Sequence, residues 1–334
     1  EEQQFIELLS QQLAPLLTDS TKNKFQLLFE SVNIKINYYK NLSKHPSSIS
    51  RLMRIAETSE MLWNYLLNHL DLLEELNNSK IEISFESLGS QLEEKLLKCE
   101  NNEEDEIDQL RQFKHKITFL LGSAEMEGVL SYENTRIGLS TLAEVIVQAA
   151  LKLSQKWLSQ RYGEIKNKYG ESGQFAIIAV GKLGGTELTY FSDLDIIFVH
   201  SGYGSTGTKN SIDAQEYWIK LIQRFISCLS TITRTGYAYK LDARLRPSGN
   251  AGVLVSPLDI YLKYHEKSQP WEHQALIKAR VIGGIGEEKW FKEVEDGVRR
   301  AVYEWIPPKD MNSQINHFRM RKEQELSGEK ENLK

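Results

Sequence analysis

A short, uninterrupted apolar run at Phe175–Val180 most constrains how this chain can fold. An uninterrupted run of this length predicts a strand that is buried on both faces of a sheet. The string GKLGG at 181–185 ends the run, and a second strand-like run, LDIIFVH, follows at 194–200. The neighbouring segments are therefore expected to supply helices that cover both faces of a small sheet.

Strand-like patterns are confined to the segment from about Phe175 to Ile282. The apolar spacing within and after this segment predicts two further strands, at 237–242 and 252–255. It also predicts helices at 213–232, 271–280 and 287–304, followed by a polar helix that runs to about residue 325.

The first half of the chain has helical spacing almost throughout. Apolar residues recur three or four positions apart near the start, at 8, 9, 13, 16 and 17. A long amphipathic helix is predicted at about 135–162, with one apolar stripe formed by Leu142, Ile146, Ala149, Leu153 and Trp157. The chain is therefore expected to be an α+β protein, mostly α, in which a small mixed sheet is flanked by helical regions.

Composition excludes several classes of protein. Among 334 residues there are 41 Lys and Arg and 46 Asp and Glu, and 41 − 46 gives a net charge of −5, which argues against bulk-charge binding to nucleic acid. No uninterrupted apolar run reaches the ~18 residues of a membrane span. Cys99 and Cys228 lack metal-ligand spacing and cannot form a disulfide framework. We expect a cytoplasmic protein that uses neither a membrane nor nucleic acid.

Two acidic residues stand at the start of the second strand, Asp193 and Asp195. Side chains two positions apart on a strand point to the same face, so the two carboxylates are expected to project together. Paired carboxylates repel each other unless a cation lies between them. Because all these donors are oxygens, the pair predicts a site for Mg²⁺ or Mn²⁺ rather than for zinc.

A third acid, Asp242, ends the strand predicted at 237–242, and Arg244 and Arg246 follow it. Arginine suits polyphosphate oxygens or carboxylates. Upstream, Gly184 and Gly185 would let the backbone approach a phosphate and present N–H donors. Two ions held by such a triad of acids would organise an in-line displacement at the α-phosphate of a nucleotide.

At this point the chain resembles a known family, the glutamine synthetase adenylyltransferases, which belong to the polymerase-β-like nucleotidyltransferases. The matching strings are GKLGGTELTYFSDLDIIF (181–198), LDARLRPSGNAGVLVSP (241–257) and WEHQALIKAR (271–280). The resemblance implies three regions, which are a helical region at 1–165, a nucleotidyltransferase module at 166–285 and the start of a C-terminal helical region at 286–334.

Members of the family carry two similar halves, one that adds AMP from ATP to a tyrosine of glutamine synthetase and one that removes it by phosphorolysis. This chain has a single Asp-x-Asp module, so it resembles one half, and the string SGNAG at 248–252 and the helical lead-in resemble the AMP-adding half. By position, the resemblance implies that the metal ligands and catalytic acids are Asp193, Asp195 and Asp242. The triphosphate contacts would be Gly184, Gly185 and Ser192. Further contacts to phosphate or to the protein substrate would come from Lys182, Arg244 and Arg246.

Several alternatives stay open. Surface ion pairing is the alternative role for Lys182, Arg244 and Arg246, and Glu272 on the helix predicted at 271–280 is expected to pair structurally. The same site could remove AMP, transfer UMP to a nitrogen-signalling protein, or belong to a regulatory module without catalysis, although an intact set of acids argues against the last. The resemblance implies glutamine synthetase as the protein substrate and leaves open a PII-type nitrogen-signalling protein as a partner.

Overall fold

The computed structural model describes four stretches of the chain, residues 18–32, 46–77, 83–207 and 211–331. Contacts divide the chain into two compact units, of which unit 1 comprises Glu1–Leu142 and Thr233–Ala238, and unit 2 comprises Ala143–Ile232 and Tyr239–Lys334. The predicted region boundaries at 165/166 and 285/286 stay predictions, and the helical spacing near the start of the chain lies outside the described residues.

Unit 1 is helical. Its elements are α2 (Asp19–Val32), α4 (Pro46–Thr58), α5 (Glu60–Asn68), the 3₁₀ helices η1 (Leu70–Asn77) and η2 (Phe85–Ser87), α6 (Leu88–Leu97), α7 (Glu103–Met126) and the first part of α8 (Tyr132–Tyr162). Polar residues cap two of these helices: the Ser59 side chain accepts from the Leu62 amide, and Asn102 from the amides of Glu104 and Asp105. Phe25, Trp63 and Phe119 lie in the buried core of the unit.

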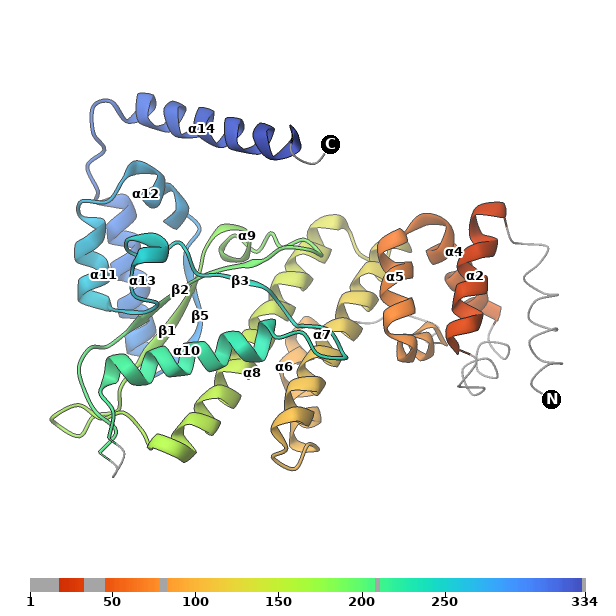
Figure 1. Cartoon of the computed structure of the whole chain (residues 1–334), viewed down its shortest axis with the longest axis horizontal. Coiled ribbons are helices and arrows are strands. Elements are labelled where there is room, and N and C mark those ends of the chain that lie inside the picture. Colours follow the sequence, from red (N-terminus) through yellow and green to blue (C-terminus); the bar gives the residue numbers. More distant parts are fainter. Residues whose placement is uncertain (1–17, 33–45, 78–82, 208–210, 332–334) are drawn as a thin grey trace. The chain divides into compact units, whose positions relative to one another are not determined.

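Unit 2 contains a small mixed sheet with the strand order β3-β2-β1-β5, to which β4 is added beside β2 (Figure 1). The strands are β1 (Phe175–Ala179), β2 (Leu194–His200), β3 (Leu241–Asp242), β4 (Ser256–Pro257) and β5 (Arg280–Ile285). β1 runs antiparallel to β2 and β5, whereas β3 and β4 run parallel to β2. The predicted α+β class, mostly helical with one small mixed sheet, is confirmed.

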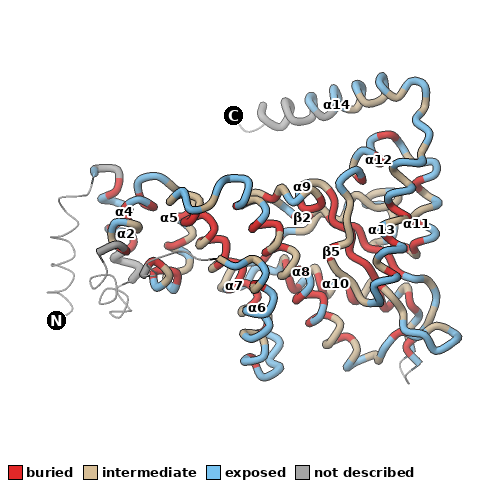
Figure 2. Tube along the Cα trace, turned by 180° about the vertical axis from the view of Figure 1, so that it is seen from behind, coloured by how far each residue is buried: buried red, intermediate tan, exposed pale blue. Residues whose placement is uncertain are grey.

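Helices cover both faces of this sheet. On one face, Ile178 and Ile197 pack with Val294 in a core formed with α11 (Leu258–His265), α12 (Pro270–Leu276) and α13 (Glu288–Tyr303). Figure 2 shows buried stretches of the chain beside α11 and α13. On the other face, α10 (Ala214–Ser230) stacks Trp218 on Phe175, with ring centroids 5.3 Å apart. The remaining helices of the unit are α9 (Gly181–Gly184), the 3₁₀ helix η3 (Gly249–Ala251) and α14 (Met311–Glu331).

Three sequence-based expectations for elements in unit 2 were wrong in detail. The third strand is Leu241–Asp242 and not 237–242, because Thr233–Ala238 forms a tight turn that belongs to unit 1. The fourth strand is Ser256–Pro257 and not 252–255. The helix predicted at 271–280 ends at Leu276, because the chain then turns into β5 and pairs with β1 from Arg280 onwards.

The long helix α8 meets the length and composition criteria for a membrane span, the one helix to do so in the described parts of the chain. However, 61% of its most apolar window is buried within the protein itself. That burial is what the core helix of a packed domain shows, and such a helix passes the same test, so length and apolar composition alone do not indicate a membrane span here.

The core between β2 and α13 predicts that substitution of a buried isoleucine lowers stability far more than substitution of an exposed one. Ile197 is 1% exposed, so we expect Ile197→Ala to lower the free energy of unfolding by about 2–5 kcal/mol, through lost burial and the cavity left behind. Ile260 on α11 is 49% exposed, and Ile260→Ala is expected to change the free energy of unfolding by less than about 0.5 kcal/mol. Urea denaturation followed by circular dichroism measures both; equal effects would contradict the packing described.

Candidate active site

The pairing of β2 with β3 brings two of the predicted acids side by side. In this parallel register Leu194 is opposite Leu241 and Asp195 is opposite Asp242. Neighbouring strands lie only about 4.8 Å apart, so side chains at matched positions interact. Asp193, two residues before Asp195, is exposed just ahead of β2.

The three carboxylates act on one another electrostatically. Burial raises the pKa of Asp195 above its usual value, and the charges of Asp242 and then Asp193 raise it further, while Arg244 and Lys182 act in the opposite direction. The structure therefore gathers the predicted acids into one region of negative charge, with two of the predicted cations close enough to oppose it. Their roles in metal binding and catalysis stay predictions.

A glycine that sequence reasoning passed over makes room for this cluster. Gly181 follows β1 and has a φ of +58°, a conformation that side chains disfavour. A Cβ at this position would lie 2.4 Å from Oδ2 of Asp195. Two independent constraints thus require glycine, and the usable signal in the sequence was a glycine placed directly after a fully buried strand.

The two glycines that were singled out have a different local reason. A Cβ on Gly184 would lie 2.3 Å from the carbonyl oxygen of Lys278, so glycine is needed here for close backbone packing. The amide of Gly184 donates to the carbonyl of Val180, and that of Gly185 to the carbonyl of Gly181. In this structure both amides thus donate to backbone carbonyls at the turn. A contact between these glycines and a triphosphate stays a prediction.

Ser192 closes the turn that precedes the acids. Its hydroxyl accepts from the amide of Thr189 at 3.1 Å and lies 2.8 Å from the Thr189 hydroxyl. These bonds fix the chain that leads into Asp193, which is a structural role. A contact between Ser192 and the triphosphate stays a prediction.

Asp242 is paired with Arg244 in this structure. The guanidinium Nη2 donates to Oδ2 at 2.5 Å, Nε donates to Oδ1 at 2.9 Å, and the Arg244 amide also donates to Oδ1 at 2.9 Å. The hydrogen bond from the Arg244 side chain is the main cause that lowers the pKa of Asp242. Arg246 instead donates to the carbonyls of Ala243 and Gly252, so it supports the loop after β3.

The donor set fits a hard divalent cation in its chemistry. Asp193, Asp195 and Asp242 offer only carboxylate oxygens, the ligands that Mg²⁺ and Mn²⁺ prefer. Within the described ranges no three His, Cys, Asp or Glu side chains are already arranged to hold a metal ion. Arg244 donates to both oxygens of Asp242, so its guanidinium would compete with a cation for that carboxylate.

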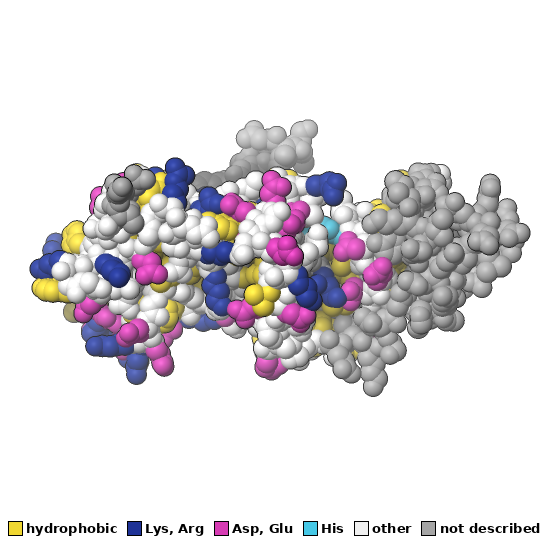
Figure 3. All heavy atoms as spheres, turned by 90° about the horizontal axis from the view of Figure 1, so that it is seen from below, with side chains coloured by type: hydrophobic (Ala, Val, Ile, Leu, Met, Phe, Trp, Pro, Cys, Tyr) yellow, Lys and Arg dark blue, Asp and Glu magenta, His cyan; other side chains and the backbone are white. Residues whose placement is uncertain are grey.

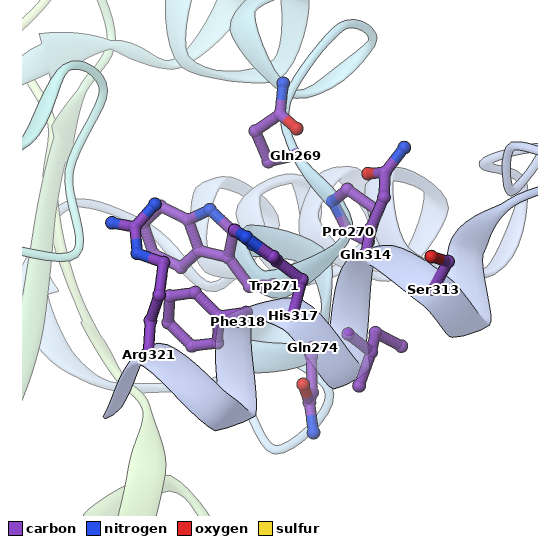
Figure 4. A pocket seen from close by; sticks show the side chains of 10 residues that line it. Gln269, Pro270, Trp271, Gln274, Ser313, Gln314, His317, Phe318 and Arg321 are labelled. Atoms are coloured by element: carbon purple, nitrogen blue, oxygen red, sulfur yellow. The ribbon is translucent and has the colours of Figure 1, made fainter. Parts of the chain in front are cut away.

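Other surface features lie apart from these acids. A cavity of about 600 Å³ between α12 and α14 is lined by Gln274, His317 and Arg321 and by Trp271 and Phe318, whose rings stack 5.5 Å apart (Figure 4). None of the predicted site residues lines it. On the face drawn in Figure 3, basic and acidic side chains are interspersed among the coloured residues.

Comparisons with known proteins found a family model and curated relatives that match this chain. Residues 49–294 match the family model described as glutamate-ammonia ligase adenylyltransferase. A curated relative from Vibrio parahaemolyticus, named bifunctional glutamine synthetase adenylyltransferase/adenylyl-removing enzyme, is 38% identical over 77% of this chain and 28% of its own length. A relative of the same name from Alteromonas mediterranea is 35% identical over 82% of this chain and 29% of its own. The chain thus spans less than a third of these relatives.

Replacement of Gly181 tests the packing around Asp195. We expect Gly181→Ala to weaken Mn²⁺ binding by about tenfold or more, because the new methyl group displaces the Asp195 carboxylate. Gly207 has a similar φ of +62° and open space around it, so Gly207→Ala carries the backbone strain alone. Electron paramagnetic resonance of Mn²⁺ measures both affinities, and equal losses would show that strain rather than contact is responsible.

Removal of the Arg244 side chain tests its competition with a cation. Without nucleotide, Arg244→Gln is expected to bind Mn²⁺ severalfold more tightly, because Asp242 no longer has to be released from a guanidinium. Arg319→Gln, which removes an equally exposed arginine paired with Glu323, is the matched control and should leave the affinity unchanged. Weaker Mn²⁺ binding by Arg244→Gln would contradict this interpretation.

Proposed function

This chain belongs to the glutamate-ammonia ligase adenylyltransferase family, and we propose that it transfers AMP from ATP to a tyrosine of glutamine synthetase, releasing pyrophosphate. The observation that carries the proposal is the register of β2 and β3, which places Asp195 beside Asp242 next to the turn at 181–185. The full names of the relatives cover both addition and removal, so the direction is part of the proposal.

The acids of the cluster would bind the metal. When bound, Mg²⁺ or Mn²⁺ would increase the acidity of the attacking hydroxyl and neutralise charge on the departing pyrophosphate. Asp193, Asp195 and Asp242 would hold the ions at the start of β2. Burial raises the pKa of Asp195 and the charges of Asp242 and Asp193 raise it further, so a cation beside these carboxylates would stabilise their charged forms.

Two cations beside the acids would bind the phosphates. Lys182 is exposed on α9 and Arg244 is exposed after β3, and the charges of both act on Asp195. With Asp242 bound to a metal ion, the guanidinium of Arg244 would be available for phosphate oxygens, which arginine can bind in a bidentate manner. Arg246 supports the loop from behind through its bonds to backbone carbonyls.

Phosphorolytic removal of AMP from the modified synthetase is the second candidate, because the relatives' names include adenylyl removal. Addition is preferred here because the string at 248–252 and the helical lead-in resemble the AMP-adding half. A PII-type partner stays a prediction.

Substitution of the acids tests the catalytic assignment. We expect Asp193→Ala and Asp195→Asn each to lower AMP transfer by about 100-fold or more while the fold persists, because charge stabilisation at the reacting phosphate is lost. Asp259→Ala, on an exposed acid of α11, is the control. The measurement is transfer of label from α-labelled ATP to purified glutamine synthetase with Mn²⁺, and a fully active Asp193→Ala would refute the assignment.

The same assay separates the alternatives. Label that appears on the synthetase supports addition. Release of label as ADP from pre-modified synthetase, only when phosphate is present, supports removal instead. A preference for UTP over ATP as donor would overturn the adenylyl assignment.

A further inference from the structure

Arg280 is the first residue of β5, and its guanidinium reaches the end of α9. Its Nε donates to the carbonyl oxygen of Gly184 at 3.0 Å, and its Nη2 donates to the carbonyl oxygen of Leu183 at 3.1 Å. Nη2 also forms an ion pair with the carboxylate of Glu144 on α8. One side chain therefore connects β5, α8 and the turn at 181–185.

The bonds from Arg280 add charged donors at the end of α9, where the last carbonyls of a helix lack intrahelical partners. The Gly184 carbonyl accepts from Nε of Arg280, and the Leu183 carbonyl, which also accepts from the Thr186 amide, accepts from Nη2. Hydrogen bonds from a charged donor are stronger than neutral ones. The Arg280 and Glu144 side chains are only 30% and 24% exposed, so water screens the pair less than it screens a surface pair.

The position of this turn affects the acids directly. At its start, the bare Cα of Gly181 lies against Oδ2 of Asp195. At its end, Gly184 packs against the backbone of Lys278, two residues before Arg280. In the sheet, Arg280 is the register partner of Ala179, the last residue of β1 before the turn. A shift of the turn would therefore move the surface against which Asp195 rests.

We propose that Arg280, oriented by Glu144, is a positioning residue that holds the 181–185 turn in place for metal and nucleotide binding and does not itself contact the nucleotide. The proposal rests on the proposed function insofar as ATP is the ligand of the site. Its structural basis is that Nε and Nη2 of Arg280 are directed at backbone carbonyls and Glu144, whereas the cations that act on Asp195 are Arg244 and Lys182.

The test compares Arg280→Gln, Arg280→Lys, Glu144→Gln and the double variant Glu144→Gln/Arg280→Gln. Binding of a fluorescent ATP analogue is measured with Mn²⁺ and without an acceptor protein, so that no transfer takes place. We expect about tenfold weaker binding for Arg280→Gln and a smaller loss for Glu144→Gln. Arg280→Lys should recover little, because an ammonium lacks the planar fork. The double variant should bind no more weakly than Arg280→Gln, because the two residues act as one unit.

A direct phosphate contact by Arg280 gives a different pattern. Removal of Glu144 would then free the guanidinium for the ligand, so Glu144→Gln would bind ATP with unchanged or higher affinity, and this result overturns the proposal. Arg299→Gln, which removes an exposed arginine paired with Asp296, is the control and should leave binding unchanged. Should Arg280→Gln fail to fold, the comparison of Glu144→Gln with the wild type still decides.

A second readout does not depend on ATP. The amides of Gly184, Gly185, Thr186 and Glu187 all donate within the turn, so their hydrogen exchange reports its local opening. Faster exchange in Glu144→Gln and Arg280→Lys, but not in Arg299→Gln, supports the positioning role, and unchanged exchange contradicts it. A wild-type protein that does not bind ATP would refute the proposed function, while the exchange result still tests the role of Arg280.

Discussion

Repulsion between carboxylates at the start of β2 is the constraint on which the site depends. The parallel register of β2 and β3 places Asp195 opposite Asp242, so the backbones that carry the two acids stay adjacent as long as the strands pair. Arg244 pairs with Asp242 and so offsets part of the repulsion without a metal. Burial, and then the charges of Asp242 and Asp193, keep the pKa of Asp195 raised. Helices packed on both faces of the sheet stabilise the strands that impose this geometry.

The parts of the fold that could be predicted are those with a local signal. β1 and β2 can be predicted from uninterrupted apolar runs, and α10 from apolar residues at helical spacing. In each case the buried residues form a pattern within one short segment. β5 could not be found this way. Its string RVIGGI contains two glycines and becomes a strand through pairing with β1, a partner about a hundred residues earlier. The short β3 likewise depends on its pairing with β2.

Site residues, too, could be predicted where a local pattern marks them. The spacing of Asp193 and Asp195 and the position of Asp242 at a strand end pointed to one acidic cluster, and the structure places the three close enough to shift the pKa of Asp195. Glu272 pairs structurally, as expected, since it accepts from the Gln269 amide and the Tyr264 hydroxyl. Gly181 was not singled out, because its need for glycine arises from a positive φ and from a side chain fourteen positions later. Its place directly after a buried strand is the local signal that could have indicated it.

Two arginines near the turn show how a partner and its exposure determine what an ion pair can do. Arg244 is 70% exposed and pairs with Asp242, a carboxylate that we propose as a metal ligand, so a metal ion would compete with the guanidinium there. Exposed pairs of this kind contribute little to stability, which makes the exchange inexpensive. Arg280 is 30% exposed, and two of its hydrogen bonds go to the backbone carbonyls of Gly184 and Leu183. Arginine thus makes an exposed side-chain pair at Asp242 and a less exposed contact with the backbone carbonyls of the turn at 181–185.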